Sequence, residues 1–408
     1  MGKTTFHHTR RKPPPRSQVV AVYMPRREFS PPKAPKKLPK NAPPSSFKLA
    51  FMQTLQGTAQ GALTPHLYHE PVNDRAQQAV NTACASLQQR HNRILYGGQA
   101  WDAFIQEGGS YRGLDQDLNA IEAALEGGLT SALPDNMRLI EYGPGGKTGV
   151  GKPAAVIKSI LQERPQQIYS YTAVDILNRF ATESALEIHE EFNLRSFAIV
   201  GDFAAKGKLV MPKAAGTVPV VLSFGGGFAN APDHSPDNGP DGKGSAVAFF
   251  SQMNRQHGLG SYVLMSYHCE RDPKKLLQEY QRTDALEAFI LSGFVRAIGE
   301  GIITDKNYDP FLHWAMEPAY NEKIKAVVEY AVCQKDHVLH TTDGKFAFKK
   351  NDRLPITLSH KWDAQDYGEI LKKAGYEIVG DKPYQSGDLP RGVVLARAVR
   401  NPPPARRL

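Results

Sequence analysis

The chain has 408 residues, 41% of them hydrophobic, with 50 lysines and arginines against 41 aspartates and glutamates. This length is enough for two domains with a packed core, and no apolar run approaches the roughly 18 residues of a membrane-spanning helix. The three cysteines are unclustered, which argues against a disulfide framework and against a zinc site. We therefore expect a monomeric cytoplasmic protein without a metal ion.

The basic charge is concentrated at the start of the chain. Residues 1–50 hold 12 lysines and arginines and one acid, Glu28, which leaves 38 basic and 40 acidic residues for the rest. Ten of the 30 prolines also lie there, and a segment of this composition buries too little apolar surface to fold. We predict a disordered tail that lacks the apolar core of a signal peptide. Its charge is suited to weak contact with nucleic acid or an acidic surface.

Residues 51–136 are predicted to be mostly helical. Amphipathic helices are expected at Ala76–Gln89 and Leu114–Leu125. Two segments rich in glycine and aromatic residues lie between them and contain Tyr96 and Tyr111. Packed aromatic residues are common in any core, so composition alone gives these tyrosines no role.

A strand, a glycine-rich turn and a helix follow in succession. The strand Arg138–Tyr142 precedes several glycines, and Ala154–Gln162 is helix-like. Glycine allows close backbone approach to a ligand, and a helix N-terminus adds free N–H groups. The run from Gly146 to Lys152 copies most of a nucleotide-triphosphate loop, but Pro153 stands where that loop needs a hydroxyl for Mg²⁺. Two other interpretations remain. The turn binds an adenosine-containing cofactor in a doubly wound sheet, or it binds nothing.

The ends of the next strands favour the adenosine-containing cofactor. The strand Ile168–Asp175 ends in an acid placed to accept ribose hydroxyls. Phe197–Val200 is followed by Asp202 and Phe203, an acid and an aromatic ring suited to adenine. No dinucleotide pattern fits, because Thr148 breaks its glycine spacing. S-adenosylmethionine is therefore the favoured cofactor.

The remaining elements extend the sheet, interrupt it and complete it. A fourth strand, Val218–Phe224, breaks into glycines, and residues 272–362 read as a separate unit of helices and strands. The other expected elements of the sheet are helices and strands at Asn178–Phe192, Ala246–Gln256, Ser261–Tyr267, Ala364–Ala374, Tyr376–Val379 and Gly392–Ala398. This order indicates an α/β chain whose sheet is closed by a hairpin-like terminal pair.

These motifs resemble the histidine-specific S-adenosylmethionine-dependent methyltransferases, whose best-known members make trimethylhistidine on the ergothioneine pathway. The similarity runs from about Leu95 to Arg397 and is carried by the ordered series Glu141-x-Gly143-x-Gly145, Ala173–Val174–Asp175, Gly201–Asp202–Phe203 and Gly225-x4-Asn230. The resemblance implies a Rossmann-like methyltransferase sheet built from 137–271 and 363–400. It also implies that the helical segment at 51–136 contributes to the substrate cavity and that 272–362 is an inserted α+β substrate unit. The predicted disordered tail occupies residues 1–50.

The resemblance assigns roles to single residues. The turn is about three residues longer than that of the family, so the lysine expected near the cofactor carboxylate is Lys147 or Lys152, and Lys152 is preferred because it adjoins the helix start. The other implied cofactor-binding residues are Glu141, Gly143, Gly145, Asp175, Asp202 and Phe203. The implied substrate-binding residues are Tyr111, Gly225, Asn230, Tyr280, Thr357 and Ser359.

One position departs from the family pattern of acid-x-Ser-x-Lys-aromatic. Ser359, Lys361 and Trp362 match, but Thr357 replaces the acid that holds the histidine imidazole. A hydroxyl cannot make the charge-assisted hydrogen bond of a carboxylate, and losing such a partner costs orders of magnitude in discrimination. Ile290 also replaces a polar residue, so we predict a substrate with a less basic, larger or more apolar side chain than histidine. An acid from a neighbouring strand, such as Glu329, is the alternative that would restore histidine binding.

The sequence thus predicts an S-adenosylmethionine-dependent N-methyltransferase that acts on the amine of a small amino-acid-like substrate other than histidine. Asn230 and Tyr280 are the predicted catalytic residues, which orient the amine and aid its loss of a proton. The alternatives are a P-loop-like nucleotide-binding protein and an inactive methyltransferase fold that docks through its basic tail.

Overall fold

The computed structural model describes residues 20–22, 98–106, 113–175, 177–201, 209, 211–212, 214–225, 243–299, 301–305, 307–342, 344–380, 384–385 and 390–402. The predicted helix Ala76–Gln89 lies outside these residues, as do four predicted site residues: Tyr111, Asp202, Phe203 and Asn230.

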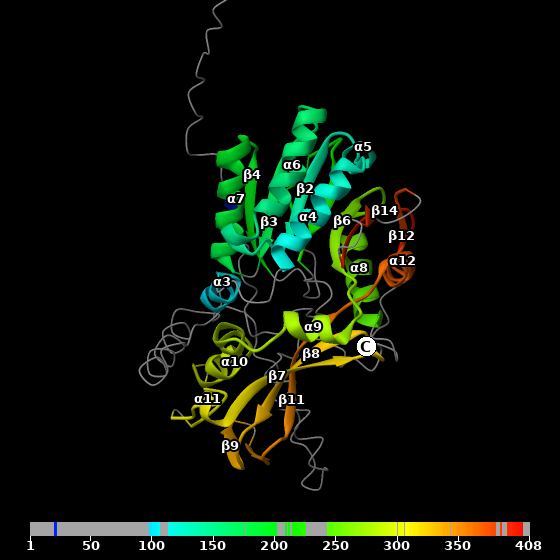
Figure 1. Cartoon of the computed structure of the whole chain (residues 1–408). Helices are drawn as coiled ribbons and strands as arrows, with labels where there is room; N and C mark the ends of the chain where they lie inside the picture. The colour runs from blue at the N-terminus through cyan, green and yellow to red at the C-terminus, as the bar shows by residue number, and fades with distance from the viewer. Residues whose placement is uncertain are drawn as a thin grey trace, which may run out of the picture.

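A mixed sheet forms the upper part of the molecule in Figure 1. Within the described residues its strand order is β1-β4-β3-β2-β5-β6-β14-β12, with β13 also on β14. The strands from β1 to β6 in this order are parallel, and β14 runs antiparallel to both β6 and β12. Their bounds are β1 Val20–Val22, β2 Met137–Tyr142, β3 Ile168–Asp175, β4 Ser196–Val200, β5 Val218–Ser223, β6 Tyr262–His268, β12 Tyr376–Ile378, β13 Tyr384–Gln385 and β14 Arg391–Ala398.

Helices cover both faces of this sheet, which explains its nearly continuous apolar strands. Successive strand residues point to opposite faces: Leu139 packs in the core with α4, α6 and α7, whereas Ile140 packs with α8 and α12. The bounds of these helices are α4 Gly113–Glu126, α6 Gly151–Glu163, α7 Asn178–Phe192, α8 Lys243–His257 and α12 Ala364–Lys373. The short α5 (Leu129–Ala132) connects α4 to β2. The predicted helix Asn178–Phe192 is confirmed, and the other predicted elements of this sheet agree to within a few residues.

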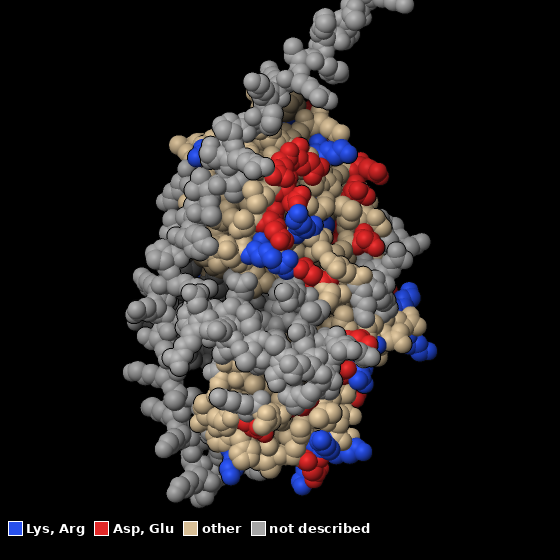
Figure 2. All heavy atoms as spheres, turned by 90° about the vertical axis from the view of Figure 1, so that its left-hand side faces the viewer, with Lys and Arg blue, Asp and Glu red and all other residues tan. Residues whose placement is uncertain are grey.

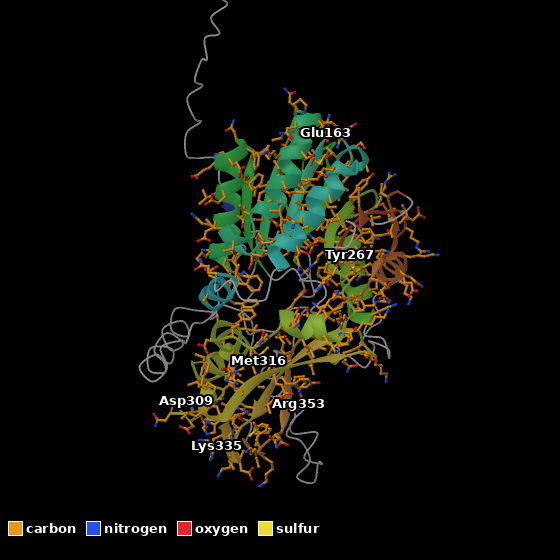
Figure 3. The ribbon with its side chains drawn as sticks, in the orientation of Figure 1. Glu163, Tyr267, Asp309, Met316, Lys335 and Arg353 are labelled. Atoms are coloured by element: carbon orange, nitrogen blue, oxygen red, sulfur yellow. The ribbon has the colours of Figure 1, made fainter. Side chains whose placement is uncertain are left out.

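A second unit lies below the main sheet in Figure 1. Its antiparallel sheet has the order β11-β8-β7, and a separate hairpin pairs β9 with β10. The bounds are α9 Pro273–Glu279, α10 Asp284–Gly299, α11 Pro310–His313, β7 Trp314–Asn321, β8 Ala326–Cys333, β9 His337–Thr341, β10 Gly344–Phe348 and β11 Arg353–His360. The sequence predicted neither β7 nor β11 as a strand. Met316 of β7 and Arg353 of β11 mark this lower sheet in Figure 3, and Tyr267 marks β6 of the main sheet.

The carboxyl ends of the parallel strands face the second unit. Figure 3 shows Glu163, the last residue of α6, at the far end of the molecule from that unit. The N-terminus of α6 therefore points toward it. The ends of β2, β3 and β5 lie at the same edge, because parallel strands that alternate with helices end together.

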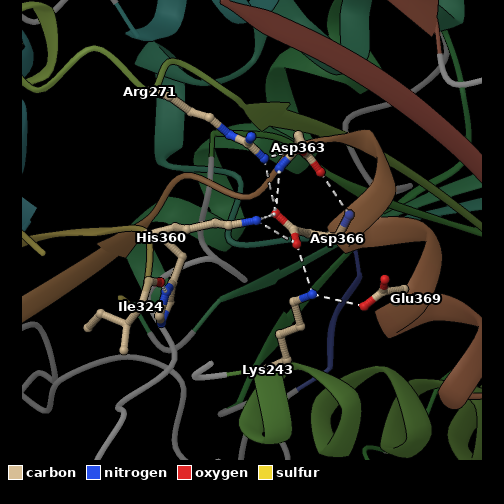
Figure 4. Close-up of polar contacts among 8 residues, drawn as sticks. Lys243, Arg271, Ile324, His360, Asp363, Asp366 and Glu369 are labelled. Atoms are coloured by element: carbon tan, nitrogen blue, oxygen red, sulfur yellow. Dashed lines mark hydrogen bonds and ion pairs between the residues drawn. The ribbon is translucent and has the colours of Figure 1, made fainter. Parts of the chain in front are cut away.

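A cluster of ion pairs joins the two units where the chain returns to the main sheet (Figure 4). Asp366 of α12 accepts hydrogen bonds from Lys325, before β8, at 2.7 and 2.9 Å, and pairs with Lys243 of α8 at 2.8 Å. Asp366 also forms a capping box with Asp363, which pairs with Arg271. Burial pushes the pKa of Asp366 upward, but the hydrogen bonds from Lys243 and Lys325 outweigh it and hold this pKa below its usual range.

The short α3 (Gly98–Gln106) packs onto the second unit. The ring of its Trp101 lies 5.7 Å from that of Phe289 in α10, and the ring of Phe104 stacks on Phe289 at 5.6 Å. On its outer side α3 meets α7 through an ion pair between Asp102 and Arg179. Figure 2 shows basic and acidic side chains intermixed on the face that carries α7.

Candidate active site

The glycine-rich turn after β2 depends on left-handed backbone. Gly143 has φ 69° and Gly145 has φ 74°, a conformation that costs glycine little and other residues much. A 3₁₀ turn, η3 (Gly146–Thr148), then leads into α6. Pro153 is buried in the first turn of α6, where proline is well tolerated because its missing N–H needs no partner.

Glu141 of β2 lies below this turn and is buried, with 1% of its surface exposed. Its carboxylate accepts a hydrogen bond from the hydroxyl of Tyr171 in β3. Burial raises the pKa of Glu141 to about 7, although the Tyr171 bond and the nearby Lys152 favour the charged form. At the end of β3, the Oδ1 atom of Asp175 accepts a hydrogen bond of 2.8 Å from the backbone of Leu177.

The two candidate lysines of the turn lie in different environments. Lys147 is exposed and pairs with Glu187 of α7 at 2.9 Å. Lys152 is buried, and its Nζ lies 3.0 Å from where a Cβ atom would stand on Gly225, at the end of β5. Burial lowers the pKa of Lys152, which Asp117 and Glu141 oppose. Lys152 therefore faces the carboxyl edge of the sheet, and Lys147 faces away from it.

Asp117 of α4 belongs to the same edge, although the sequence analysis gave it no role. It is 1% exposed, and its Oδ1 accepts a hydrogen bond of 3.3 Å from Arg391 of β14. Its Oδ2 is buried, has no hydrogen-bond partner among the described residues, and lies 3.7 Å from the Cβ position of Gly225. A signal was present in the sequence, since Asp117 occupies the buried stripe of α4 with Ala120, Ile121 and Ala124.

Three side chains of the second unit form a hydrogen-bonded triangle. The hydroxyl of Tyr280, which caps α9, donates to the Oγ of Ser359 in β11 at 2.9 Å. The Nζ of Lys361 donates to Tyr280 at 2.8 Å and to Ser359 at 3.0 Å. Two residues predicted to bind the substrate, Tyr280 and Ser359, are thus in direct contact.

Thr357 lies two residues before Ser359, on the same face of β11, and is paired in register with Glu329 of β8. Its hydroxyl donates a hydrogen bond to Glu329 Oε2. Glu329 is 5% exposed, and its Oε1 is buried with no hydrogen-bond partner in the part of the chain that the structure describes. Burial raises the pKa of Glu329 to about 7, against the Thr357 bond and the nearby Lys361. This end of the site therefore does hold an acid, contrary to the premise that Thr357 makes it less polar.

Ile290 makes no polar contact in this site. It is fully buried in the hydrophobic core of the second unit with Phe294, Val295 and Trp314. Its apolar character is explained by that packing.

Titratable side chains lie between the cofactor edge and the second unit. His268, at the end of β6, lies 3.6 Å from Glu279 at the end of α9. Burial, Lys361 and Arg391 together hold the pKa of His268 far below its usual range, so its ring is neutral. Lys361 is also within electrostatic range of Arg391 and Asp117. The cofactor edge and the triangle therefore share one buried polar region.

The fold and this edge define an enzyme class. The main sheet is parallel except for β14, which lies between β6 and the edge strand β12. This sheet, together with the glycine turn after β2 and the acid at the end of β3, is typical of α/β methyltransferases. The chain matches the family model of the histidine-specific methyltransferases, described as S-adenosylmethionine-dependent, over residues 114–382, more than half of its length. It therefore belongs to this family, and the resemblance read from the sequence is confirmed. The protein is a methyltransferase that uses S-adenosylmethionine.

Solved structures that match the chain are distant. A S-adenosylmethionine-dependent methyltransferase from Clostridium acetobutylicum is 11% identical with a TM-score of 0.35, covering 74% of this chain and 96% of its own. The CcbJ methyltransferase from Streptomyces caelestis is 13% identical with a TM-score of 0.33, covering 69% and 95%. The 1,6-didemethyltoxoflavin-N1-methyltransferase from Burkholderia thailandensis is 10% identical with a TM-score of 0.34, covering 81% and 92%. At such scores they carry no argument about the substrate.

Among curated proteins, no sequence matches this chain. In the part of the chain that the structure describes, none of the helices has the length and apolar character needed to cross a bilayer. The nucleotide-triphosphate interpretation of the glycine turn finds no support in the family.

The residues of the sheet edge fit S-adenosylmethionine. Its methionyl part carries an ammonium and a carboxylate, and the edge offers a buried carboxylate oxygen without a partner, Asp117 Oδ2, close to the buried ammonium of Lys152. Asp175 lies at the end of the second sheet strand, where such sheets hold ribose hydroxyls.

Proposed function

We propose that the enzyme methylates the amine of a small amino-acid-like substrate bound between the cofactor edge and the face of the second unit. The observation that carries the proposal is the triangle of Tyr280, Ser359 and Lys361, in which Tyr280 and Lys361 are buried and Ser359 is half-buried. Its Lys361 is within electrostatic reach of Asp117 and Arg391. Burying polar groups costs free energy unless they are hydrogen-bonded, and a small-molecule site uses a few convergent polar groups to orient its ligand.

Different residues would bind the cofactor and orient the substrate amine. Bound S-adenosylmethionine supplies an electrophilic methyl group on its sulfonium. Lys152 would hold the methionyl carboxylate, Asp117 the ammonium and Asp175 the ribose, while Asp202 and Phe203 stay predictions for the adenine. Tyr280 would orient the substrate amine with Asn230, because holding the reactants in line supplies much of the acceleration.

Glu329 supports a particular kind of substrate side chain. Its Oε1 is buried and has no hydrogen-bond partner among the residues that the structure describes, and an unpaired buried acceptor costs about 1–3 kcal/mol. A substrate N–H or O–H donor at this position would remove that cost, whereas an aliphatic side chain would leave it. We therefore favour an amino acid with a donor-bearing side chain over the apolar one expected from Thr357, and histidine becomes a candidate again.

Two measurements test this function. Calorimetry should show binding of S-adenosylhomocysteine that Asp175→Ala weakens. A methyl-transfer assay over the free amino acids should then show turnover that is highest for side chains with a hydrogen-bond donor. No binding at high micromolar ligand, with Asp175→Ala behaving like the wild type, would disprove the cofactor site. Fastest turnover with an aliphatic or phenyl side chain would disprove the role of Glu329.

A further inference from the structure

We propose that Lys361 accepts the proton that the substrate ammonium must lose, and that it does so through the hydroxyl of Tyr280. The inference rests on the proposed function, because it assumes an amine bound beside Tyr280. It assigns to Lys361 a role beyond packing, as a residue that acts through another residue.

The geometry places Lys361 behind Tyr280. Lys361 follows β11 directly and is 2% exposed. Its Nζ lies 2.8 Å from the Tyr280 hydroxyl, 3.0 Å from the Ser359 Oγ and 4.8 Å from the centre of the Tyr280 ring. With three protons the Nζ donates to both oxygens, and with two protons its lone pair can accept from the Tyr280 hydroxyl. The same contact thus serves both protonation states.

Charges from several elements surround the ammonium. The groups that face Lys361 come from α4, β6, α9, β8 and β14, and they are Asp117, His268, Glu279, Tyr280, Glu329 and Arg391. Burial is the largest influence, and together with Arg391 it lowers the pKa of Lys361 to about 7, against the three acids. A lysine with such a pKa is in part neutral near neutral pH, as a proton acceptor must be.

The proton step is balanced within the enzyme and its substrate. One N–H bond of the substrate ammonium breaks as its proton passes to the Tyr280 oxygen, while the former Tyr280 proton forms a new N–H bond at Lys361 Nζ. Tyr280 is unchanged at the end, Lys361 has gained one positive charge, and the substrate has lost one. The electron pair of the broken bond stays on the substrate nitrogen, which is then able to act as a nucleophile.

A merely structural role makes a different prediction. If Lys361 only neutralises Glu279 and Glu329, it stays charged throughout the working pH range, and Lys361→Arg should preserve function. If Lys361 accepts a proton, arginine cannot replace it, because the guanidinium does not lose its charge in proteins.

The first experiment measures the titration of Lys361 without any turnover. Enzyme labelled with ¹³C at the lysine Cε is titrated by NMR, and the Lys361 signal is identified by its absence in Lys361→Arg. The expected midpoint for Lys361 is near 7, whereas Asp336 raises the pKa of Lys349, an exposed lysine that serves as the internal control. A Lys361 signal that remains charged beyond pH 9 overturns the proposal, whether or not an acceptor amino acid is known.

The second experiment measures the pH dependence of kcat/KM with the fastest acceptor from the amino-acid panel. In the wild type, kcat/KM should rise with pH through an inflection near 7. Lys361→Arg should lose this inflection and fall on the order of 100-fold at neutral pH, and Lys349→Arg should leave it intact. Tyr280→Phe should produce a similar loss, and the double variant should be no worse than either single variant.

Thermal unfolding of each variant checks that it folds. A retained inflection in Lys361→Arg, with activity near that of the wild type, overturns the proposal while leaving amine methylation standing. The loss of cofactor binding or of all turnover in the wild type would instead count against the proposed function.

Discussion

The cofactor edge and the second unit contain the same three-part arrangement. At the edge, a buried carboxylate, Glu141, takes a hydrogen bond from a hydroxyl, Tyr171, near a buried lysine, Lys152. In the second unit, Glu329 takes a hydrogen bond from Thr357 near Lys361. Burial raises the pKa of both carboxyls to about 7.

The two arrangements differ in which carboxylate oxygen lacks a hydrogen-bond partner among the described residues. Within the described ranges, Glu329 Oε1 is buried without a hydrogen-bond partner, and Glu141 has no oxygen in that state. At the cofactor edge the unpaired oxygen belongs instead to Asp117, which stands beside Lys152. We propose that Asp117 and Glu329 are the acids that pair with donor groups of the ligands, whereas Glu141 is held by Tyr171.

The largest effect is expected at the cofactor edge. Lys152→Met should weaken S-adenosylhomocysteine binding about 100-fold, because it removes a charge-assisted hydrogen bond worth about 1.5–3 kcal/mol. The affinity for 5′-methylthioadenosine, which lacks the amino-acid part, should change little. Lys147→Met is the matched control, since that lysine is exposed on the outer side of the same turn. Calorimetry of both ligands would contradict the assignment if Lys147→Met weakened binding and Lys152→Met did not.

The next effect concerns how the free energy of unfolding depends on the titration of Glu329. Its pKa is raised in the folded protein, so its neutral form stabilises the fold fully below the unfolded pKa near 4.5, and this contribution is lost as pH rises through about 7. Glu329→Gln, which stays neutral, should therefore gain up to about 3 kcal/mol over the wild type between pH 5 and pH 8. Urea unfolding at the two pH values measures the gain. An unchanged difference between variant and wild type would show that Glu329 does not titrate in this range.

The smallest effect tests the junction between the two regions. Asp366→Asn should lower the free energy of unfolding by about 1–2 kcal/mol at pH 7, because Lys243 and Lys325 lose their shared carboxylate. The pKa of Asp366 is lowered in the fold, so its contribution is present above the unfolded pKa near 4 and disappears as pH falls further. Glu369→Gln removes the exposed partner of the same Lys243 and should cost almost nothing. Equal losses in both variants would contradict this account of the junction.

The two regions also differ in how far the sequence could predict them. At the cofactor edge the signals are local: Glu141, Gly143 and Lys152 lie within one strand, turn and helix, and Asp175 ends the next strand. The position of Lys152 at the helix start was enough to favour it over Lys147. The position of Asp117 on the apolar stripe of α4 is a signal of burial, but its place in the site follows from its partner Arg391, 274 residues away in the sequence.

The second unit depends on pairing between distant residues. Glu329 meets Thr357 because β8 and β11 are antiparallel and their register shifts between Pro355 and Thr357. A shift of one residue turns every side chain of a strand to the other face, so no local pattern reveals which acid pairs with Thr357. The contact of Lys361 with Tyr280 similarly joins β11 to the end of α9.

The central claim is methyl transfer to an amine held between these two regions. The most direct measurement is mass spectrometry of the free amino acids after incubation with the enzyme and S-adenosylmethionine, with fragmentation to locate any added methyl group. The account predicts methylation on the α-amine of an amino acid whose side chain carries a hydrogen-bond donor, and its loss in Tyr280→Phe. An enzyme that binds S-adenosylhomocysteine but methylates none of the amino acids, or that methylates a side chain instead of the amine, would contradict it.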